Sequence, residues 1–88
     1  MGIDHKGLHK IRKALGLTLD EMGALMNVSG PHLHYIEKGS RPLRGEQIAL
    51  LIREIGLTPE RLASLIAAYD AADTAKELAR RKLVVLAR

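Results

Sequence analysis

The sequence predicts an all-α protein made of short helices, and three observations indicate this class. Apolar residues recur three and four positions apart along most of the chain, which is the spacing of a helix that buries one side. Ser, Thr and Asp, which commonly cap helices, precede several of these stretches, and Gly or Asn follows them. A short strand competes with the helical interpretation only at Val84-Val85, near the C-terminal end.

The first helix is expected over residues 6–15, where apolar residues define one buried stripe. Asp4 precedes the helix as its cap, and Leu8, Ile11 and Leu15 lie three and four positions apart. The basic residues on its other sides are either solvated or turned toward phosphate; they are Lys6, Lys10, Arg12 and Lys13.

The stretch from residue 19 to residue 38 predicts two short helices joined by a tight turn. Asn27 tolerates the left-handed backbone that ends a helix, and Ser29 follows as the cap of the next one. Thr18 caps the first of the two helices, and Gly23 in its middle allows a neighbouring helix to approach closely. The apolar residues fit two helices that meet at a corner; they are Met22, Leu25, Met26, Val28, Leu33 and Ile36. This pattern is typical of a helix-turn-helix unit.

Beyond this unit the sequence predicts a basic loop and a strongly apolar helix. Residues 40–44 form the loop, which is broken by Pro42, and residues 46–55 form the helix. We expect the apolar positions of that helix to belong entirely to the core; they are Ile48, Leu51, Ile52 and Ile55. Thr58 and Pro59 then begin a final helical segment.

Residues 59–88 form a helix-prone segment that is either one long helix or two helices broken near residues 70–74. Its apolar residues recur at roughly heptad spacing, so this stripe must be covered by the rest of the domain or by another subunit. Because the core is expected to be complete without this segment, the sequence favours dimerisation. The predicted dimerisation residues are Leu65, Tyr69, Leu78, Leu83 and Leu86.

Composition limits the classes of function that the chain can support. Lys and Arg number 14 against 10 Asp and Glu, a net charge of +4 that favours polyanionic partners. There is no Cys and no apolar run of membrane-spanning length, so we expect a cytoplasmic protein without disulfides or thiolate metal sites. His5 and His9 are spaced as a workable pair on one helical face, but His32 and His34 point away from each other, and no Cys or nearby acidic residue completes a zinc site. No catalytic constellation is apparent. We therefore expect neither an enzyme nor a bound metal or other cofactor.

The stretch 19–38 resembles the Cro and phage-repressor family, whose lambda-repressor-like, Xre-type domains bind DNA through a helix-turn-helix. The resemblance extends from Leu8 to Leu57. Within it, Ile36-Glu37-Lys38-Gly39 is similar to the sequence that closes the recognition helix in that family. The resemblance implies a five-helix DNA-binding domain over residues 1–58 and an extra C-terminal helical segment over residues 59–88, in the same folding unit.

The resemblance also implies roles for single residues. Glu37 is expected to pair with a basic residue of the first helix, for which Arg12 is the candidate. The base-contacting positions correspond to Ser29, Gly30, Pro31 and Tyr35, flanked by His32 and His34. The predicted phosphate contacts are Thr18, Lys38, Ser40, Arg41 and Arg44. The family often has Gln, Arg or Asn at the base-contacting positions and Gln at the position of Leu19, whereas this chain does not. We therefore expect apolar contact of Pro31 with a thymine methyl, and the shape of the groove, to contribute more to sequence discrimination here.

Together these features predict a homodimeric, sequence-specific transcriptional regulator that binds double-stranded DNA and represses by occupying a promoter operator. The alternative is an antitoxin or other protein-interaction module of the same fold, which binds a toxin or another partner protein through residues 59–88. A phage protein that silences a neighbouring operon differs from the first possibility only in its genomic context.

Overall fold

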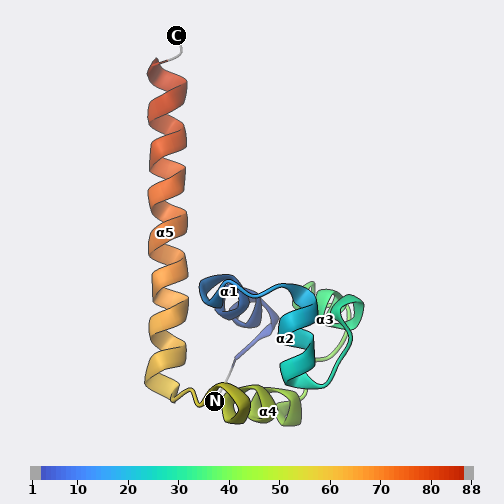
Figure 1. The fold of residues 1–88 in the computed structure, drawn as a ribbon. Helices are drawn as coiled ribbons and strands as arrows, with labels where there is room; N and C mark the ends of the chain where they lie inside the picture. Colours follow the sequence, from blue (N-terminus) through green and yellow to red (C-terminus); the bar gives the residue numbers. More distant parts are fainter. Residues whose placement is uncertain (1–2, 87–88) are drawn as a thin grey trace.

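A computed structural model describes residues 3–86, which fold into five helices and contain no strand. The helices are α1 (His5–Leu15), α2 (Leu19–Met26), α3 (Gly30–Glu37), α4 (Gly45–Ile55) and α5 (Pro59–Leu86). Helices α1 to α4 form one group, and α5 runs along one side of it and then continues well beyond it (Figure 1). The all-α prediction is therefore confirmed.

The helices begin at the capping residues that the sequence predicts. The Asp4 carboxylate accepts a hydrogen bond of 2.7 Å from the backbone N–H of Gly7 at the start of α1. Thr18 and Glu21 form a reciprocal capping box at the start of α2, with bonds of 3.1 and 2.9 Å. The Thr58 hydroxyl accepts a bond of 3.2 Å from a backbone N–H in the first turn of α5. Local sequence thus determines where these helices start.

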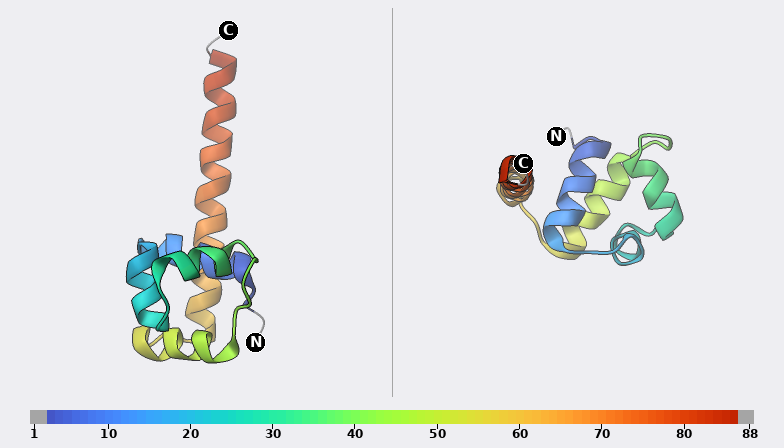
Figure 2. Two further views of the ribbon diagram at one scale, coloured as in Figure 1. Left: turned by 90° about the vertical axis from the view of Figure 1, so that its right-hand side faces the viewer. Right: turned by 90° about the horizontal axis from the view of Figure 1, so that it is seen from above.

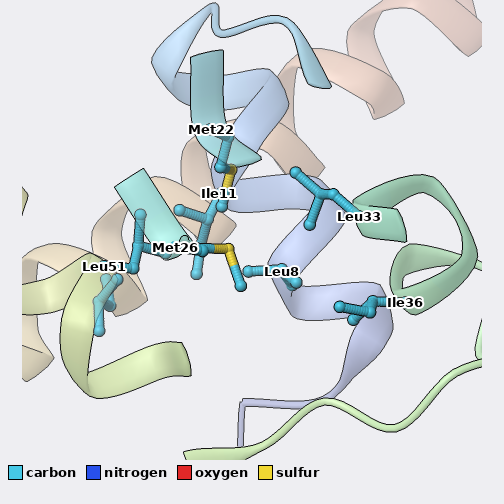
Figure 3. Close-up of a cluster of buried hydrophobic side chains, with 8 residues drawn as sticks. Leu8, Ile11, Met22, Met26, Leu33, Ile36 and Leu51 are labelled. Carbon is cyan, nitrogen blue, oxygen red and sulfur yellow. The ribbon is translucent and has the colours of Figure 1, made fainter. Parts of the chain in front are cut away.

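The core lies where α1, α2 and α3 meet, and α4 and α5 close it with one buried leucine each (Figure 3). Burial of each of these apolar side chains stabilises the fold by roughly 1.5 to 3 kcal/mol. The buried apolar residues are Leu8, Ile11, Met22, Met26, Leu33, Ile36, Leu51 and Leu62. Because α3 contributes Leu33 and Ile36, one side of that helix is fixed to the core and the other faces solvent.

The expectation that the apolar side of α4 belongs entirely to the core is confirmed for Leu51 and holds only in part for the others, since Ile52 and Ile55 pack against the core while remaining partly exposed. Leu51 is buried with 1% of its surface exposed, whereas Ile48, Ile52 and Ile55 are only half-buried. The reason is that α4 packs mainly against α2 and lies at the edge of the group (Figure 2), so the margins of its apolar stripe reach solvent.

Helix α5 is unbroken, so the predicted alternatives of a break near residues 70–74 and of a strand at Val84-Val85 are wrong. The hydroxyl of Thr74 donates to the carbonyl of Asp70 at 2.9 Å within the helix, and neither residue caps a new one. No helix within residues 3–86 has both the length and the apolar character needed to cross a bilayer.

The first turns of α5 complete the core, which corrects the expectation that earlier residues supply all of it. Leu62 is buried with 3% of its surface exposed, and Leu65 and Ile66 pack against the core beside it. Gly7 of α1 lies beside this contact, since a Cβ added there would be 3.7 Å from the Ile66 side chain, an ordinary contact distance. The fifth helix of the domain and the predicted extra segment are therefore the same helix.

Candidate nucleic-acid interface

The turn between α2 and α3 has the geometry that the sequence predicts. Asn27 ends α2 with a left-handed φ of 58°, and its N–H is directed at carbonyls in the last turn of α2. A Cβ added to Gly23 would lie 2.6 Å from the carbonyl oxygen of Val28, so the backbone of the turn passes too close for any larger residue. These backbone contacts hold α3 at a defined angle to α2.

Helix α3 turns one side to the core and the other to solvent. The Ser29 hydroxyl caps the helix by accepting a bond of 3.1 Å from the N–H of His32. Tyr35 is 50% exposed, and its ring meets that of His34 edge-on with 5.5 Å between centroids. The exposed residues on the outward side are Ser29, Pro31, His32, His34 and Tyr35. Five of the six residues expected near the bases are thus exposed to solvent.

Gly30 differs from these five residues because it is buried, although it lines a groove beside Pro31 and Tyr35, and its role in base contact stays a prediction. A Cβ added to Gly30 would collide with the carboxylate of Asp20 on α2. Gly30 therefore allows α2 and α3 to cross closely.

A shallow groove of about 440 Å³ runs between the start of α2 and the outward side of α3. Leu19, half-buried at the start of α2, forms part of its apolar lining together with Pro31 and Tyr35. The predicted site residues do not include Leu19. The signal that marks it is its position, where the resembled family often has Gln.

The loop after α3 carries most of the predicted phosphate contacts and is bound to the end of that helix. The N–H groups of Ser40 and Arg41 donate to the carbonyl of Tyr35 at 2.9 and 3.2 Å. Gly39 permits this reversal with a φ of 82°. Thr18 is also exposed, at the α2 end of the groove, and its hydroxyl can still donate while it caps α2. The exposed polar residues of the loop segment are Lys38, Ser40, Arg41 and Arg44.

A second groove, between α1 and the end of α3, adds a cation whose role the sequence leaves undecided. Lys13 is exposed in this groove together with His34 and Lys38. Lys10, by contrast, is paired with Asp70 of α5 at 2.8 Å. Lys13 lies beside the end of α3 only because α1 packs on α3. No local motif in the sequence could therefore have identified Lys13 as part of the candidate interface.

Glu37 is the electrostatic centre of the contact between α1 and α3. Arg12 donates to both of its carboxylate oxygens, from Nε at 2.7 Å and from Nη2 at 3.0 Å, and His9 Nδ1 lies 2.7 Å from Oε1. The side chains of Arg12 and Glu37 are only 9% and 5% exposed. Burial acts to raise the pKa of Glu37, but the bonds from Arg12 and His9 outweigh it and hold the pKa below its usual value. The predicted pairing of Glu37 with Arg12 is confirmed.

The four histidines make different contacts. His9 is bound to Glu37, and His5 lies against Gly39. His32 and His34 face solvent on α3. Within residues 3–86, no group of three or more His, Cys, Asp or Glu side chains is close enough to hold a metal ion.

The predicted dimerisation residues fall into two groups. Leu65 and Tyr69 are half-buried; Leu65 packs against the core, and the ring of Tyr69 meets that of His9 edge-on at 6.3 Å. Leu78, Leu83 and Leu86 lie on the projecting part of α5 and are 59%, 64% and 69% exposed. The second group has no contact with the core and is open to a partner.

Comparison with known proteins identifies the family. The crystal structure of the clp gene regulator ClgR from Corynebacterium glutamicum is similar to this chain, with a TM-score of 0.56 and 25% sequence identity, covering 90% of this chain and 84% of that one. None of the curated proteins compared matches the chain. The family model described as a helix-turn-helix domain matches residues 7–80. Since this match spans most of the sequence, the chain belongs to the helix-turn-helix domain family.

Proposed function

We propose that this chain is a transcriptional regulator that binds double-stranded DNA sequence-specifically by inserting α3 into the major groove. The observation that carries the proposal is that Leu33 and Ile36 anchor α3 to the core while its opposite side remains exposed. An α-helix fits the major groove, where the edges of all base pairs are distinguishable. Membership of the helix-turn-helix family supports the same role, as does similarity to a protein whose title calls it a gene regulator.

In this proposal the residues around α3 divide into two sets. The base-facing set supplies discrimination, and the phosphate-facing set supplies affinity and orientation. The base-facing residues are Ser29, Pro31, His32, His34 and Tyr35. The phosphate-facing residues are Lys13, Thr18, Lys38, Ser40, Arg41 and Arg44. The buried charge of Glu37 is neutralised by Arg12 and so opposes neither set.

The reading surface is unusually apolar for this role. Leu19, Pro31 and Tyr35 line the groove beside α3, and none of them offers the bidentate hydrogen bonding of Arg, Asn or Gln. The 5-methyl group of thymine is the apolar feature of the major groove that such a surface can contact. We therefore propose that thymine methyls contribute to the sequence preference, together with hydrogen bonds from His32 and His34.

We further propose that the protein is a homodimeric repressor of the Xre/Cro type, acting in the cytoplasm. Each subunit would place one α3 in successive major grooves of a pseudo-palindromic operator, with half-sites about 10 bp apart. Exposed Leu78, Leu83 and Leu86 support association through α5. Repression follows if the operator overlaps a promoter, and this requires no cofactor.

Selection of bound sites from random duplex DNA tests the proposal. We expect the wild-type chain to enrich one motif, and His32→Ala and Tyr35→Ala to relax the preference at particular positions. Arg41→Ala should weaken binding to all sequences uniformly and reduce the dependence of log affinity on log salt concentration by about one unit.

Arg53→Ala is the matched control, because it also removes one exposed arginine but lies on α4, outside the base-facing and phosphate-facing sets and away from α5. It should leave both motif and salt dependence unchanged. The proposal is wrong if the wild-type chain enriches no motif, or if its binding to DNA does not weaken between low and moderate salt.

The second candidate function is that of an antitoxin or another protein-binding module. The exposed leucines of α5 favour it, because large apolar side chains in solvent mark protein contacts. Purification from the native host distinguishes the two. A different protein recovered in stoichiometric amount, and released by Leu83→Asp, favours the module, whereas recovery of this chain alone favours the regulator.

A further inference from the structure

The C-terminal half of α5 is a helix without support from its own domain. The last side chain of α5 bound to α1 is Asp70, which pairs with Lys10. From residue 71 to residue 84, and again at Leu86, every side chain is exposed. An isolated helix of this length is marginal in water, so this half of α5 needs a partner to remain helical.

We propose that α5 pairs in antiparallel orientation with α5 of a second copy of this chain, centred near Ala75, and that Leu83 of each copy occupies a groove between α1 and α5 of the other. The inference rests on the proposed function, because it specifies the dimer that presents two reading helices to DNA.

One side of α5 carries a continuous seam of small and then large apolar residues. At 3.6 residues per turn, these positions fall on one side of the helix. The seam residues are Ala68, Ala71, Ala72, Ala75, Leu78, Ala79, Leu83 and Leu86, with Lys82 among them. Val84, although also exposed, lies on the opposite side. An antiparallel pair sets the leucines of one copy against the alanines of the other at constant spacing, whereas a parallel pair sets alanine on alanine and leucine on leucine.

The charges of α5 favour the same orientation. Residues 59–74 carry three acidic side chains and one basic one, a net charge of −2. Residues 75–86 carry four basic side chains and one acidic one, a net charge of +3. Antiparallel pairing brings the basic half of one copy to the acidic half of the other and opposes the two helix dipoles. Parallel pairing would place two clusters of Arg80, Arg81 and Lys82 side by side.

A groove at the junction of α1 and α5 offers a site for the partner's Leu83. Its volume is about 450 Å³, and its lining residues are Lys13, Ala14, Leu65, Ala68, Tyr69, Ala72 and Lys76. In a pair centred on Ala75, the partner's Leu83 lies level with Ala67 and Ala68, beside this groove. One contact then covers both the exposed Leu83 of the partner and the apolar part of this groove.

The pairing also sets where the two reading helices lie. Helix α1 packs against the side of α5 that carries Leu62, Ile66 and Tyr69, about a third of a turn from the seam. A two-fold axis perpendicular to the paired helices therefore leaves both α1–α4 groups on the same side of the pair. In each group α3 lies on the far side from α5 (Figures 1 and 2), so both reading helices lie away from the paired helices and are not covered by them.

The spacing of the two groups agrees with the geometry of DNA. Each group contacts α5 around residues 62–69, about ten residues from Ala75. At about 1.5 Å per residue, the two groups are separated by roughly 30 Å along the pair. Successive major grooves on one face of B-DNA lie about 34 Å apart, so the offset of the two groups along the pair is of the same order as the distance between adjacent half-sites.

Disulfide trapping tests the orientation without background, because the chain has no cysteine. Ala68→Cys and Lys82→Cys are made separately, and each keeps the leucines of the seam. We expect a cross-linked dimer when the two variants are mixed and oxidised, and none from either variant alone. Self-linking of Lys82→Cys would show parallel pairing and overturn the proposal, as would a wild-type chain that sediments as a monomer at micromolar concentration.

A matched pair of substitutions tests the seam. We expect Leu83→Asp to give a monomer and Val84→Asp to remain a dimer, because only Leu83 lies on the seam although both side chains are similarly exposed. Circular dichroism confirms that the α1–α4 group remains folded in both. Equal loss of the dimer in the two variants, or in neither, contradicts the proposal.

The two proposals fail in different ways. If the chain does not bind DNA, cross-links between Ala68→Cys and Lys82→Cys still form while site selection enriches no motif. If the antiparallel dimer is wrong, the wild-type chain enriches a motif while those cross-links are absent.

Discussion

At the scale of single residues, Glu37 fixes the position of α3 relative to α1. Its carboxylate is bound from α1 by Arg12 and His9, and Arg12 also donates to the carbonyl of Leu17 at 3.0 Å, in the turn before α2. One buried ion pair therefore joins α1, the turn that follows it and α3. Loss of this ion pair should therefore alter the position of α3 as a whole and not only one side-chain contact.

Glu37→Gln should destabilise the protein by roughly 2 to 4 kcal/mol, because it leaves the buried guanidinium of Arg12 without its counter-charge. Urea unfolding at neutral pH measures the change. Glu46→Gln, which alters an exposed side chain on α4, is the control and should change stability by less than about 0.5 kcal/mol. Equal effects of the two substitutions would show that the ion pair is not stabilising.

The same residue predicts how stability depends on pH. The pKa of Glu37 is lower in the folded chain than its ordinary value. Ionisation of this carboxylate therefore stabilises the folded state relative to the unfolded state. This contribution is complete above the ordinary range of Glu, near about 4.3, and is lost as the pH falls below it. Wild type should therefore lose more stability than Glu37→Gln between neutral pH and acidic pH, as followed by urea unfolding across the range.

Replacement of thymine by uracil tests the apolar reading surface one methyl group at a time. At positions that face Pro31 or Tyr35, each replacement should weaken binding about threefold to fourfold, the value of one buried methyl group. Uracil at thymines outside the selected motif is the control and should have no effect. If Tyr35→Ala remains as sensitive to uracil as wild type, the methyl groups contact some other residue.

Gly23→Ala should destabilise the fold by about 1 to 3 kcal/mol even though alanine has the higher helix propensity, because the added Cβ meets the backbone carbonyl of Val28. Gly45→Ala is a matched control on α4, where a Cβ meets nothing within 4 Å. Thermal unfolding should show a lower midpoint for the first variant and an equal or higher midpoint for the second. The reverse order would mean that the turn can move away from α2.

At the scale of elements, the parts of the fold that the sequence predicts best are those set by neighbours in the chain. The bounds of α2 follow from Thr18 and Asn27, and the start of α3 follows from Ser29. Each of these signals is a hydrogen bond or backbone angle within three or four residues. The outward residues of α3 could be predicted for the same reason, because helical periodicity assigns them once Leu33 and Ile36 are inside.

The parts that could not be predicted depend on contacts between distant residues. Gly30 has the local features of an exposed helix start, and only the carboxylate of Asp20 on α2 shows why it is buried. Lys13 reaches the reading side because α1 packs on α3. The entry of Leu62 into the core follows from the packing of the first turns of α5 against α1, which sequence periodicity does not reveal.

The two halves of α5 should respond differently to truncation of a leucine or valine. Leu62→Ala should cost about 2 to 5 kcal/mol, because it leaves a cavity in the core. Val84→Ala, on the exposed side away from the seam, should change stability by less than about 0.5 kcal/mol. Chemical unfolding of both variants measures the difference. A small effect of Leu62→Ala would mean that α5 is not part of the folding unit.

At the scale of the whole molecule, the proposed dimer predicts a dependence on the spacing of half-sites. Insertion of about 5 bp, half a helical turn, moves one half-site to the opposite side of the duplex. Wild-type affinity should then fall roughly 100-fold, since only one subunit can bind at a time. The Leu83→Asp monomer should bind both operators equally weakly in an equilibrium binding assay. Wild-type affinity that is independent of spacing would contradict simultaneous binding by two subunits.

The separation of α3 from α5 has a consequence for how such a regulator diversifies. In the proposed dimer, the residues that choose the bases lie on α3 and at the start of α2, whereas the residues that set the distance between half-sites lie on the projecting part of α5. A mutation in one region leaves the other unchanged. Over evolutionary time the chain can therefore acquire new target genes without changing operator architecture, or a new architecture without changing the half-site.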